Sequence, residues 1–272
     1  MRAYVEAYGC TLNFGESREI EDLLLNRGWE LAGSPEDCDL VVLVTCVVIE
    51  TTERAMLKRI GELANAPNLV VTGCMATACR QKAVRVAPNA AFVPPGDLAG
   101  FSRLIEETER PVVPVDRMRD SYCIVPIATG CLGSCAYCIT RLARGQLKSR
   151  PVTRIVSAVE KAAEHGPREI QITAQDTAAY GGDIETSLPE LVDRICQIPL
   201  DFRLRIGMMN PRNALPLAEE IGGMYLQPKV FKFLHMPAQS ASDKLLEEME
   251  RGYTMDDFKK IVNALKASFP EM

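Results

Sequence analysis

The sequence predicts an α/β protein in which a small doubly wound α/β domain precedes a βα barrel or partial barrel. Apolar runs and amphipathic helical patterns alternate along most of the 272 residues, the order that builds parallel sheets. The alternation weakens between residues 101 and 120, where acidic residues and prolines predict a helix end and an extended linker. We therefore assign the first domain to residues 1–110, the linker to 111–120 and the second domain to 121–272.

The first domain is expected to contain three strands and two helices in alternation. The strands are predicted at Ala3–Tyr8, Leu40–Val44 and Leu69–Thr72, and the helices at Glu16–Asn26 and Ile49–Leu63. The run Leu40–Val44 is apolar throughout, as is typical of a strand that is buried on both faces. The strand–helix order therefore predicts a parallel sheet covered by helices.

The second domain repeats this strand–helix pattern four times. Its strands are predicted at Cys123–Ala128, Ile170–Thr173, Leu204–Met208 and Val230–His235. Its helices are predicted at Arg154–Glu164, Leu188–Ile198, Leu215–Gly222, Asp243–Glu250 and Asp256–Ala267. Four βα units in a row indicate a barrel or partial barrel.

Composition and charge narrow the classes of protein. The residues are 47% hydrophobic, no apolar run is long enough for a membrane span, and the N-terminus resembles a strand rather than a signal peptide. We therefore expect a cytoplasmic protein whose ten cysteines bind metals or clusters rather than form disulfides. The net charge of −5 argues against a bulk nucleic-acid binder, but five basic residues and no acid lie between Ile139 and Val159.

Cys131, Cys135 and Cys138, here called the second triplet, form a C-x3-C-x2-C motif directly after the apolar run Ile124–Ala128. Three thiolates can bind three irons of a [4Fe–4S] cluster and leave the fourth iron open. An open iron beside a reducible cluster suits one-electron chemistry on bound S-adenosylmethionine. A zinc knuckle is the alternative, but it needs four ligands, and neither of the two histidines is near the motif.

Three further cysteines, here called the N-terminal triplet, each follow a predicted strand: Cys10, Cys46 and Cys74. The carboxyl ends of parallel strands meet at one edge of a sheet, so these thiols are expected to converge and bind a second cluster. Gly9 and Gly73 precede two of them and suit tight turns. Buried structural thiols are the alternative. The remaining cysteines are interpreted as packing thiols: Cys38, Cys79, Cys123 and Cys196.

Several segments carry a resemblance to a known family. They are Tyr137–Gly145, Gln175–Gly181, Arg205–Pro211 and His235–Asp243. Together with the two triplets, they resemble the methylthiotransferases of the radical-SAM superfamily, in the archaeal and eukaryotic branch that acts on N6-threonylcarbamoyladenosine of tRNA. The segments Ala143–Gly145 and Gly207–Pro211 favour this branch over the one that modifies a ribosomal protein.

The resemblance implies a fold, cofactors and partners. It implies an auxiliary cluster on Cys10, Cys46 and Cys74, and a catalytic cluster that cleaves S-adenosylmethionine on Cys131, Cys135 and Cys138. It also implies tRNA, an external electron donor and a sulfur source as partners, and no membrane. The product would carry a 2-methylthio group at C2 of adenosine 37. Relatives continue with further barrel strands and a β-rich RNA-binding domain, so the chain resembles a truncated member with a radical-SAM partial barrel.

Other polar residues are weaker candidates. Gln175 and Asp176 follow the strand Ile170–Thr173, Arg205 lies inside a strand, and His235 and Gln239 lie at and beyond the end of the fourth strand. At the rim of a barrel these five could bind the cofactor, although a structural salt bridge for Arg205 and a core position for His235 remain open.

Four basic residues follow the second triplet and are candidates for guiding tRNA phosphates or the threonylcarbamoyl carboxylate: Arg141, Arg144, Lys148 and Arg150. A solvated surface is the alternative for them. For the whole chain, the competing functions are a ribosomal-protein methylthiotransferase, another radical-SAM enzyme that modifies RNA, and a cluster-binding fragment without catalysis.

Overall fold

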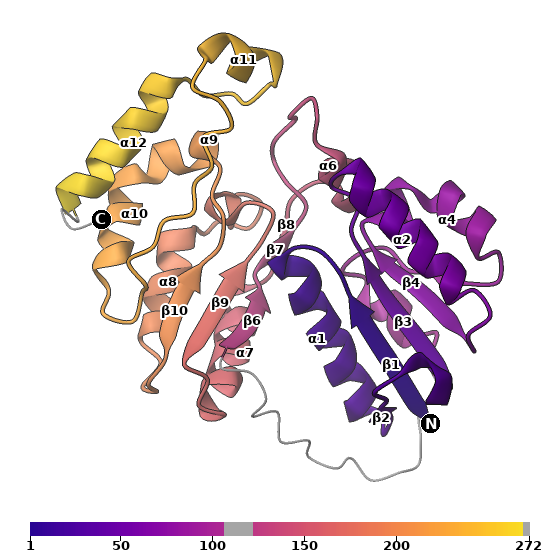
Figure 1. Cartoon of the computed structure of the whole chain (residues 1–272). Coiled ribbons are helices and arrows are strands. Elements are labelled where there is room, and N and C mark those ends of the chain that lie inside the picture. The colour runs from indigo at the N-terminus through magenta and orange to yellow at the C-terminus, as the bar shows by residue number, and fades with distance from the viewer. Residues whose placement is uncertain (106–121, 269–272) are drawn as a thin grey trace. The chain divides into compact units, whose positions relative to one another are not determined.

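The computed structural model describes residues 1–105 and 122–268 (Figure 1). These residues form two units. The first contains residues 1–105 and Cys138–Gly145, and the second contains residues 122–137 and 146–268. The linker expected at 111–120 lies outside the described residues.

The first unit is built on a five-stranded parallel sheet with strand order β2-β1-β3-β4-β5 (Figure 1). The strands are β1 (Arg2–Ala7), β2 (Glu30–Leu31), β3 (Leu40–Thr45), β4 (Leu69–Gly73) and β5 (Ala91–Phe92). All six residues of β3 are buried, as the unbroken apolar run predicted. The three strands expected here are confirmed, and the two short edge strands were not predicted.

Helices cover both faces of this sheet. They are α1 (Thr11–Asn26), α2 (Glu50–Glu62), α3 (Met75–Ala78), α4 (Arg80–Val86), α5 (Leu98–Ser102) and α6 (Ile139–Arg144), with a 3-10 turn at Pro35–Asp37. Val42 of β3 packs in one core with Leu24 of α1, whereas Leu43 packs in another core with Ile60 of α2. Alternate residues of β3 therefore serve two cores, which confirms the doubly wound architecture.

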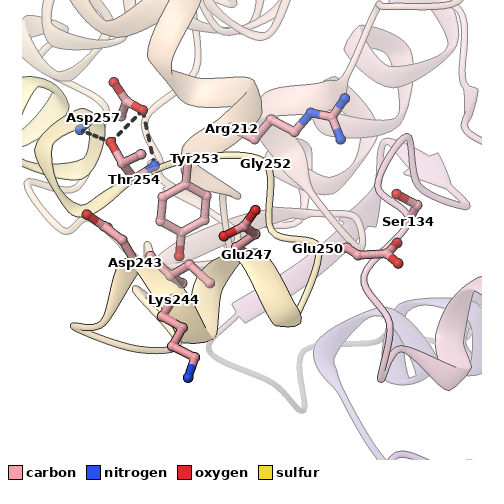
Figure 2. A pocket seen from close by; sticks show the side chains of 11 residues that line it. Ser134, Arg212, Asp243, Lys244, Glu247, Glu250, Gly252, Tyr253, Thr254 and Asp257 are labelled. Atoms are coloured by element: carbon pink, nitrogen blue, oxygen red, sulfur yellow. Dashed lines mark hydrogen bonds between the residues drawn. The ribbon is translucent and has the colours of Figure 1, made fainter.

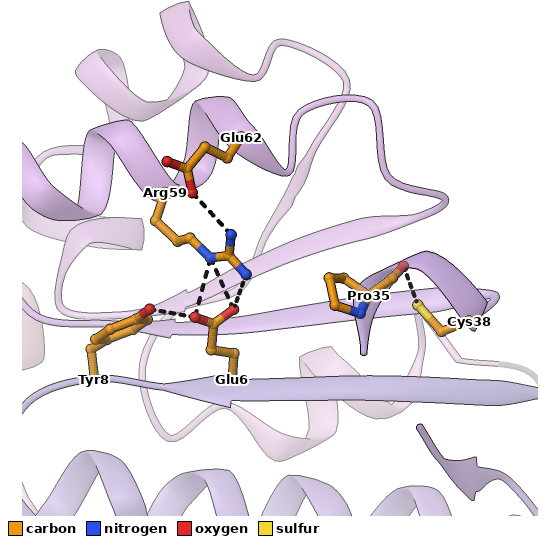
Figure 3. A network of polar contacts seen from close by, with 6 residues as sticks. All are labelled: Glu6, Tyr8, Pro35, Cys38, Arg59 and Glu62. Carbon is orange, nitrogen blue, oxygen red and sulfur yellow. Dashed lines mark hydrogen bonds and ion pairs between the residues drawn. The ribbon is translucent and has the colours of Figure 1, made fainter. Parts of the chain in front are cut away.

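A polar cluster joins β1 to α2 near the end of β1 (Figure 3). The Glu6 carboxylate accepts hydrogen bonds from the Arg59 guanidinium at 2.8 to 3.1 Å and from the hydroxyl of Tyr8. Arg59 also donates to Glu62 at 2.9 Å. In the same view, the buried Cys38 thiol donates to the carbonyl of Pro35 at 3.2 Å, in agreement with its interpretation as a packing thiol.

Helix α6 belongs to the first unit although it follows the second triplet in sequence. Its residues Ile139 and Ala143 pack in the core that contains Met75 of α3. No helix was predicted there, because the basic residues of this stretch were interpreted as a surface patch. The apolar residues at positions 139 and 143 are four apart, which is the spacing that fixes one helix face.

The second unit contains a three-stranded parallel sheet with order β10-β9-β6. Its strands are β6 (Tyr122–Pro126), β9 (Glu169–Thr173) and β10 (Arg203–Ile206), and the pair β7 (Ala128–Thr129) and β8 (Lys148–Ser149) is antiparallel. The helices are α7 (Val152–Glu164), α8 (Leu188–Cys196), α9 (Pro211–Ala214), α10 (Ala218–Leu226), α11 (Asp243–Glu248) and α12 (Met255–Ser268), with 3-10 turns at Thr177–Ala179 and Leu215–Leu217.

The prediction of a fourth strand at Val230–His235 is wrong. Val230 forms only an isolated parallel bridge with Leu204, whose amide donates to the carbonyl of Lys229 at 2.7 Å. The amide of Phe233 donates back to the carbonyl of Phe231 at 2.8 Å, and this tight turn diverts the chain from the sheet. Three parallel strands and a bridging segment thus form a partial barrel wall.

Two other predicted elements have boundaries that differ from the expectation. The strand expected at Cys123–Ala128 stops at Pro126, and Ala128 pairs with Ser149 instead. The helix expected at Leu215–Gly222 begins as a 3-10 turn with a proline at its second position and becomes α-helical only from Ala218. In the described residues, no helix is long and apolar enough to cross a membrane.

Candidate metal centres

The N-terminal triplet follows three neighbouring strands of the first unit. Cys10 is the N-cap of α1 after β1, Cys46 follows β3, and Cys74 follows β4. Because β1, β3 and β4 are adjacent in the sheet, the three residues lie at one edge. The amide of Cys74 donates to the carbonyl of Thr45 at 2.9 Å, and the charges of Cys10 and Cys46 act on the Cys74 thiol. The sheet therefore gathers the three thiols as the sequence predicted.

Two glycines let the loops of the N-terminal triplet approach each other. Gly9 has φ +117°, and a Cβ at this position would lie 2.7 Å from Cβ of Cys46. Gly73 has φ +82°, and a Cβ there would lie 2.3 Å from the carbonyl oxygen of Thr45. Both the left-handed backbone and the short distances exclude a side chain, so these positions require glycine.

A buried polar network supports the same loops. The Asn13 side chain is fully buried, and its amide donates to the carbonyls of Tyr8 at 2.7 Å and Thr45 at 2.9 Å. Its oxygen accepts from Arg144 at 2.7 Å. Arg144 also pairs with Glu16 through contacts of 2.5 and 2.9 Å, and the two side chains are only 1% and 5% exposed.

This network corrects the prediction that Arg144 guides tRNA phosphates. Its guanidinium is buried against Glu16 and Asn13, so it is not a surface cation. Burial alone would lower the pKa of Arg144, but the hydrogen bond and charge of Glu16 outweigh it and raise that pKa, so the group stays charged. A signal was present in the sequence, because Cys10, Asn13 and Glu16 recur every three residues and share one face of α1.

Arg144 also acts on Cys74. Burial raises the pKa of the Cys74 thiol, whereas the charge of Arg144 and a hydrogen bond from it lower that pKa. A thiol binds iron as the thiolate, so a cation at this place favours the ligating form.

The second triplet is divided between the two units. Cys131 and Cys135 belong to the second unit, and Cys138 is the N-cap of α6 in the first unit. All three are partly exposed. The amide of Gly133 donates to the Cys131 sulfur at 3.2 Å, and a Cβ on Gly133 would lie within 3.4 Å of that sulfur and 3.7 Å of the Cys135 sulfur. Both sulfurs therefore flank the Gly133 backbone.

Arg251 lies beside Cys135 and was not predicted. It is 7% exposed, and one guanidinium nitrogen donates to the Cys135 sulfur at 3.2 Å and to the Tyr137 hydroxyl at 3.3 Å. Its guanidinium carbon lies 5.6 Å from the ring centroid of Tyr253. Its Nε is buried without a hydrogen-bond partner, and no carboxylate of the described residues forms an ion pair with it. No local pattern in the sequence connects position 251 with position 135.

Each donor set consists of three thiols, and thiolates are the ligands of [4Fe–4S] clusters. Within residues 1–105 and 122–268, no three His, Cys, Asp or Glu side chains are arranged to hold one metal ion. In a [4Fe–4S] cluster each thiolate binds a different iron, so the sulfurs do not converge on one point. Three thiols at one sheet edge, with a cation beside one of them, match this requirement.

Family models match both parts of the chain. Residues 2–94 match the uncharacterized protein family UPF0004, and residues 125–271 match the radical SAM superfamily. A probable threonylcarbamoyladenosine tRNA methylthiotransferase from Pyrococcus horikoshii is 37% identical, over all of this chain and 68% of its own length. The threonylcarbamoyladenosine tRNA methylthiotransferase of Xenopus laevis is 33% identical, over 99% of this chain and 52% of its own length.

The chain belongs to the radical-SAM methylthiotransferases. It is thus an enzyme of a superfamily that uses S-adenosylmethionine and a [4Fe–4S] cluster. The fold agrees, because a solved structure of the radical S-adenosylmethionine methyltransferase TsrM from Kitasatospora setae matches with a TM-score of 0.60. That match covers 98% of this chain and 65% of TsrM at 14% identity. The chain spans about two thirds of the archaeal relatives and about half of the animal ones.

Two of the five cofactor-binding candidates of this methylthiotransferase have polar partners within the protein. Asp176 is buried, and its carboxylate accepts from the amides of Ala178 and Asn210 at 3.1 and 2.9 Å and from the side chain of Asn213 at 2.7 Å. It therefore ties the loop after β9 to α9, and its role toward a cofactor stays a prediction. Arg205 is half-exposed, pairs with Glu169 at 3.7 Å and lies over the ring of Phe233, in agreement with the structural salt bridge that the sequence left open for it.

The other three candidates are placed differently. The Gln175 side chain has a buried oxygen without a hydrogen-bond partner, which leaves it able to accept from a ligand. His235 and Gln239 are exposed and lie in the irregular segment after the isolated bridge, where Gln239 has φ +69°. Of the basic residues, Arg141 and Lys148 are exposed and Arg150 is half-buried.

The second unit also contains an open cavity of about 790 Å³ (Figure 2). It is lined by Ser134 of the loop that carries the second triplet, by Arg212 of α9, and by residues of α11, of the start of α12 and of the segment between these two helices, which contains Tyr253. The lining carries four carboxylates and two cations, and none of the five cofactor-binding candidates contributes to it.

Proposed function

We propose that this chain contains the catalytic part of a tRNA-modifying enzyme that inserts sulfur and a methyl group at C2 of N6-threonylcarbamoyladenosine 37. The placement of Cys10, Cys46 and Cys74 on three neighbouring strand ends is the observation that carries this proposal. A second set of cluster ligands is what separates sulfur insertion from radical-SAM reactions that need one cluster. The archaeal and animal relatives, which are named as threonylcarbamoyladenosine tRNA methylthiotransferases, support the choice of substrate.

In this proposal each triplet holds one [4Fe–4S] cluster. When bound, the clusters and S-adenosylmethionine supply one-electron cleavage of the cofactor, removal of hydrogen from C2, the sulfur atom and a methyl group from a second S-adenosylmethionine. Cys131, Cys135 and Cys138 leave one iron open for the amino and carboxylate groups of the cofactor. Arg251 holds the Cys135 sulfur and keeps a positive charge there. An external electron donor and a sulfur source complete the reaction.

The remaining roles are also proposals. Gln175 offers an unpartnered acceptor for the cofactor. Arg141, Lys148 and Arg150 supply positive charge for tRNA phosphates, since the first two are exposed and the third is partly so. His235 and Gln239 lie in an exposed segment from which they can reach a ligand. Action on tRNA in the cytoplasm agrees with this assignment.

The first test measures iron and sulfide after anaerobic reconstitution. The wild type is expected to bind about eight irons, and Cys10→Ala/Cys46→Ala/Cys74→Ala about four. Cys38→Ala/Cys79→Ala, which removes two thiols outside the triplets, serves as the matched control and should retain about eight. Four irons in all three proteins would leave a radical enzyme with one cluster and remove the basis for sulfur insertion.

The second test identifies the substrate. Nucleosides of tRNA incubated with the reconstituted enzyme, reductant and S-adenosylmethionine are analysed by mass spectrometry. The threonylcarbamoyladenosine should gain one sulfur atom and one CH2 group, and a parallel incubation with ribosomal proteins should give no such gain. Modification of the protein sample alone would identify the ribosomal-protein methylthiotransferase instead.

A further inference from the structure

The starting observation is that a residue beyond the second triplet lies at the base of the N-terminal triplet. Arg144 is six positions after Cys138, on α6, and α6 is part of the first unit. Ile139 and Ala143 anchor this helix in the core that also contains Cys74 and Met75. The helix therefore delivers the guanidinium to a fixed place beside Cys74.

Each contact of Arg144 leads to one of the three cysteine loops. Its hydrogen bond to Asn13 reaches the side chain that also binds the carbonyls of Tyr8 and Thr45, two residues before Cys10 and one before Cys46. The Thr45 carbonyl also accepts from the amide of Cys74 at 2.9 Å, so the same network reaches the third loop, and the charge of Arg144 lowers the pKa of the Cys74 thiol against the effect of burial. The three loops thus share one buried cation.

Glu16 balances this cation. Its carboxylate contacts both terminal nitrogens of Arg144 at 2.5 and 2.9 Å, and it lies on α1, the helix that begins after Cys10. Both charges are almost completely shielded from water, where charge interactions are stronger than at the surface. Of the two charges, that of Arg144 acts on the Cys74 thiol and lowers its pKa against the effect of burial, so the pair presents its positive end to the triplet.

A positive end beside a cluster ligand has a defined electronic effect. Reduction adds one negative charge to a cluster, and a nearby cation stabilises the reduced form more than the oxidised form. A carboxylate at the same place has the opposite effect. Removing either member of the pair should therefore move the reduction potential in opposite directions.

We propose that Arg144, balanced by Glu16, is a positioning residue that sets the reduction potential of the cluster bound by Cys10, Cys46 and Cys74. The inference rests on the proposed function, because it requires a cluster at the N-terminal triplet. In this proposal α6, which directly follows the second triplet in sequence, carries the residue that sets the reduction potential of the cluster at the N-terminal triplet.

The test isolates the N-terminal cluster by working in a Cys131→Ala/Cys135→Ala parent, in which Cys138 remains as the N-cap of α6. The reduction potential is measured by EPR-monitored titration after reconstitution. Arg144→Met should lower the potential relative to the parent, and Glu16→Gln should raise it. Arg144→Met/Glu16→Gln should lie between the two. Arg141→Met, an exposed arginine of the same helix, is the matched control and should leave the potential unchanged.

Each outcome separates the inference from the proposed function. A parent without bound iron would overturn the proposed function. A parent with iron whose potential is the same in all variants, or moves in one direction with both single substitutions, would overturn the role of Arg144. If Arg144→Met does not fold, Glu16→Gln and the double variant still decide the matter, since an unchanged potential in Glu16→Gln contradicts the inference.

Discussion

The two triplets each have an arginine beside one cysteine, but the charge of that arginine is balanced in only one of them. Arg144 hydrogen-bonds Asn13 at the loops of the N-terminal triplet and forms a buried ion pair with Glu16. Arg251 hydrogen-bonds Cys135 and Tyr137 and has no carboxylate partner among the described residues. The arginine beside the N-terminal triplet is therefore part of a neutral pair, whereas the charge of the arginine beside the second triplet is not balanced by a carboxylate of the described residues. A neutral pair suits a cluster that is held in place, and a free positive charge suits a place where an anionic group must bind.

The largest effect is expected from breaking the balanced pair. Arg144→Met leaves the Glu16 carboxylate buried without a partner and should lower the free energy of unfolding by about 3–5 kcal/mol. The single tryptophan, Trp29, is buried in the first unit, so its fluorescence during denaturant unfolding of the apoprotein reports on this unit. Arg144→Met/Glu16→Gln should recover most of the loss, and a loss in the double variant equal to the sum of the losses of Arg144→Met and Glu16→Gln would show that the pair is not coupled.

A smaller effect is expected at the unbalanced arginine. Arg251→Met removes hydrogen bonds to Cys135 and Tyr137 but leaves no buried opposite charge, so it should cost about 1.5–3 kcal/mol. Far-UV circular dichroism is the measurement, because the second unit has no tryptophan. A loss as large as that of Arg144→Met would contradict the difference drawn between the two sites.

Asp176 differs from Arg144 and Arg251 in that it is a buried acidic residue, and its carboxyl group accepts hydrogen bonds from neighbouring amides. Burial raises the pKa of its carboxyl, and the hydrogen bonds from Asn210, Asn213 and Ala178 oppose this only in part. The folded state then binds the proton more tightly than the unfolded state, so this group stabilises the fold below its ordinary pKa and the contribution is lost as pH rises through the raised value. The free energy of unfolding of the wild type should therefore fall relative to that of Asp176→Asn from about pH 4 upward. A constant difference over this range would show that the carboxyl has an ordinary pKa.

The smallest effect on stability is expected at the exposed cations. Arg141→Ala/Lys148→Ala should change the free energy of unfolding by less than about 0.5 kcal/mol per substitution and leave the iron content unchanged. Binding of tRNA should weaken, and the salt dependence of binding should fall by about one unit of slope for each lost phosphate contact. Arg154→Ala, also in the basic stretch but outside the candidate set, is the control. Unaltered tRNA affinity in the double variant would remove these residues from the interface.

The parts of the molecule that follow from short-range patterns could be predicted from the sequence. The apolar run of β3 required a strand buried on both faces, and the cysteines that follow β1, β3 and β4 were placed correctly because parallel strands align their carboxyl ends. Helix α7 and helix α12 were found from their apolar spacing within two residues of their ends. In these cases one local rule determined the result.

The parts that depend on long-range contacts were missed. Arg144 belongs to a stretch with five basic residues and no acid, so the pattern indicated a surface, whereas its partner Glu16 lies 128 positions away. Arg251 reaches Cys135 across 116 positions. The segment Val230–His235 has the composition of a strand, but a turn between Phe231 and Phe233 ends its pairing. These ion pairs, hydrogen bonds and turns depend on how distant parts of the chain pack together. A local pattern in a single sequence does not show which residues will meet.

The insertion of residues 138–145 into the first unit affects the order in which the protein can mature during synthesis. Residues 1–105 leave the ribosome first, and domains generally fold as their residues emerge. At that stage Glu16 and Asn13 lack the guanidinium that they bind in the finished structure, so the first unit remains incomplete until Gly145 has been translated. By then the second triplet has also been made. The N-terminal cysteines therefore acquire their final surroundings only after all six cysteines of the two triplets are present on the nascent chain.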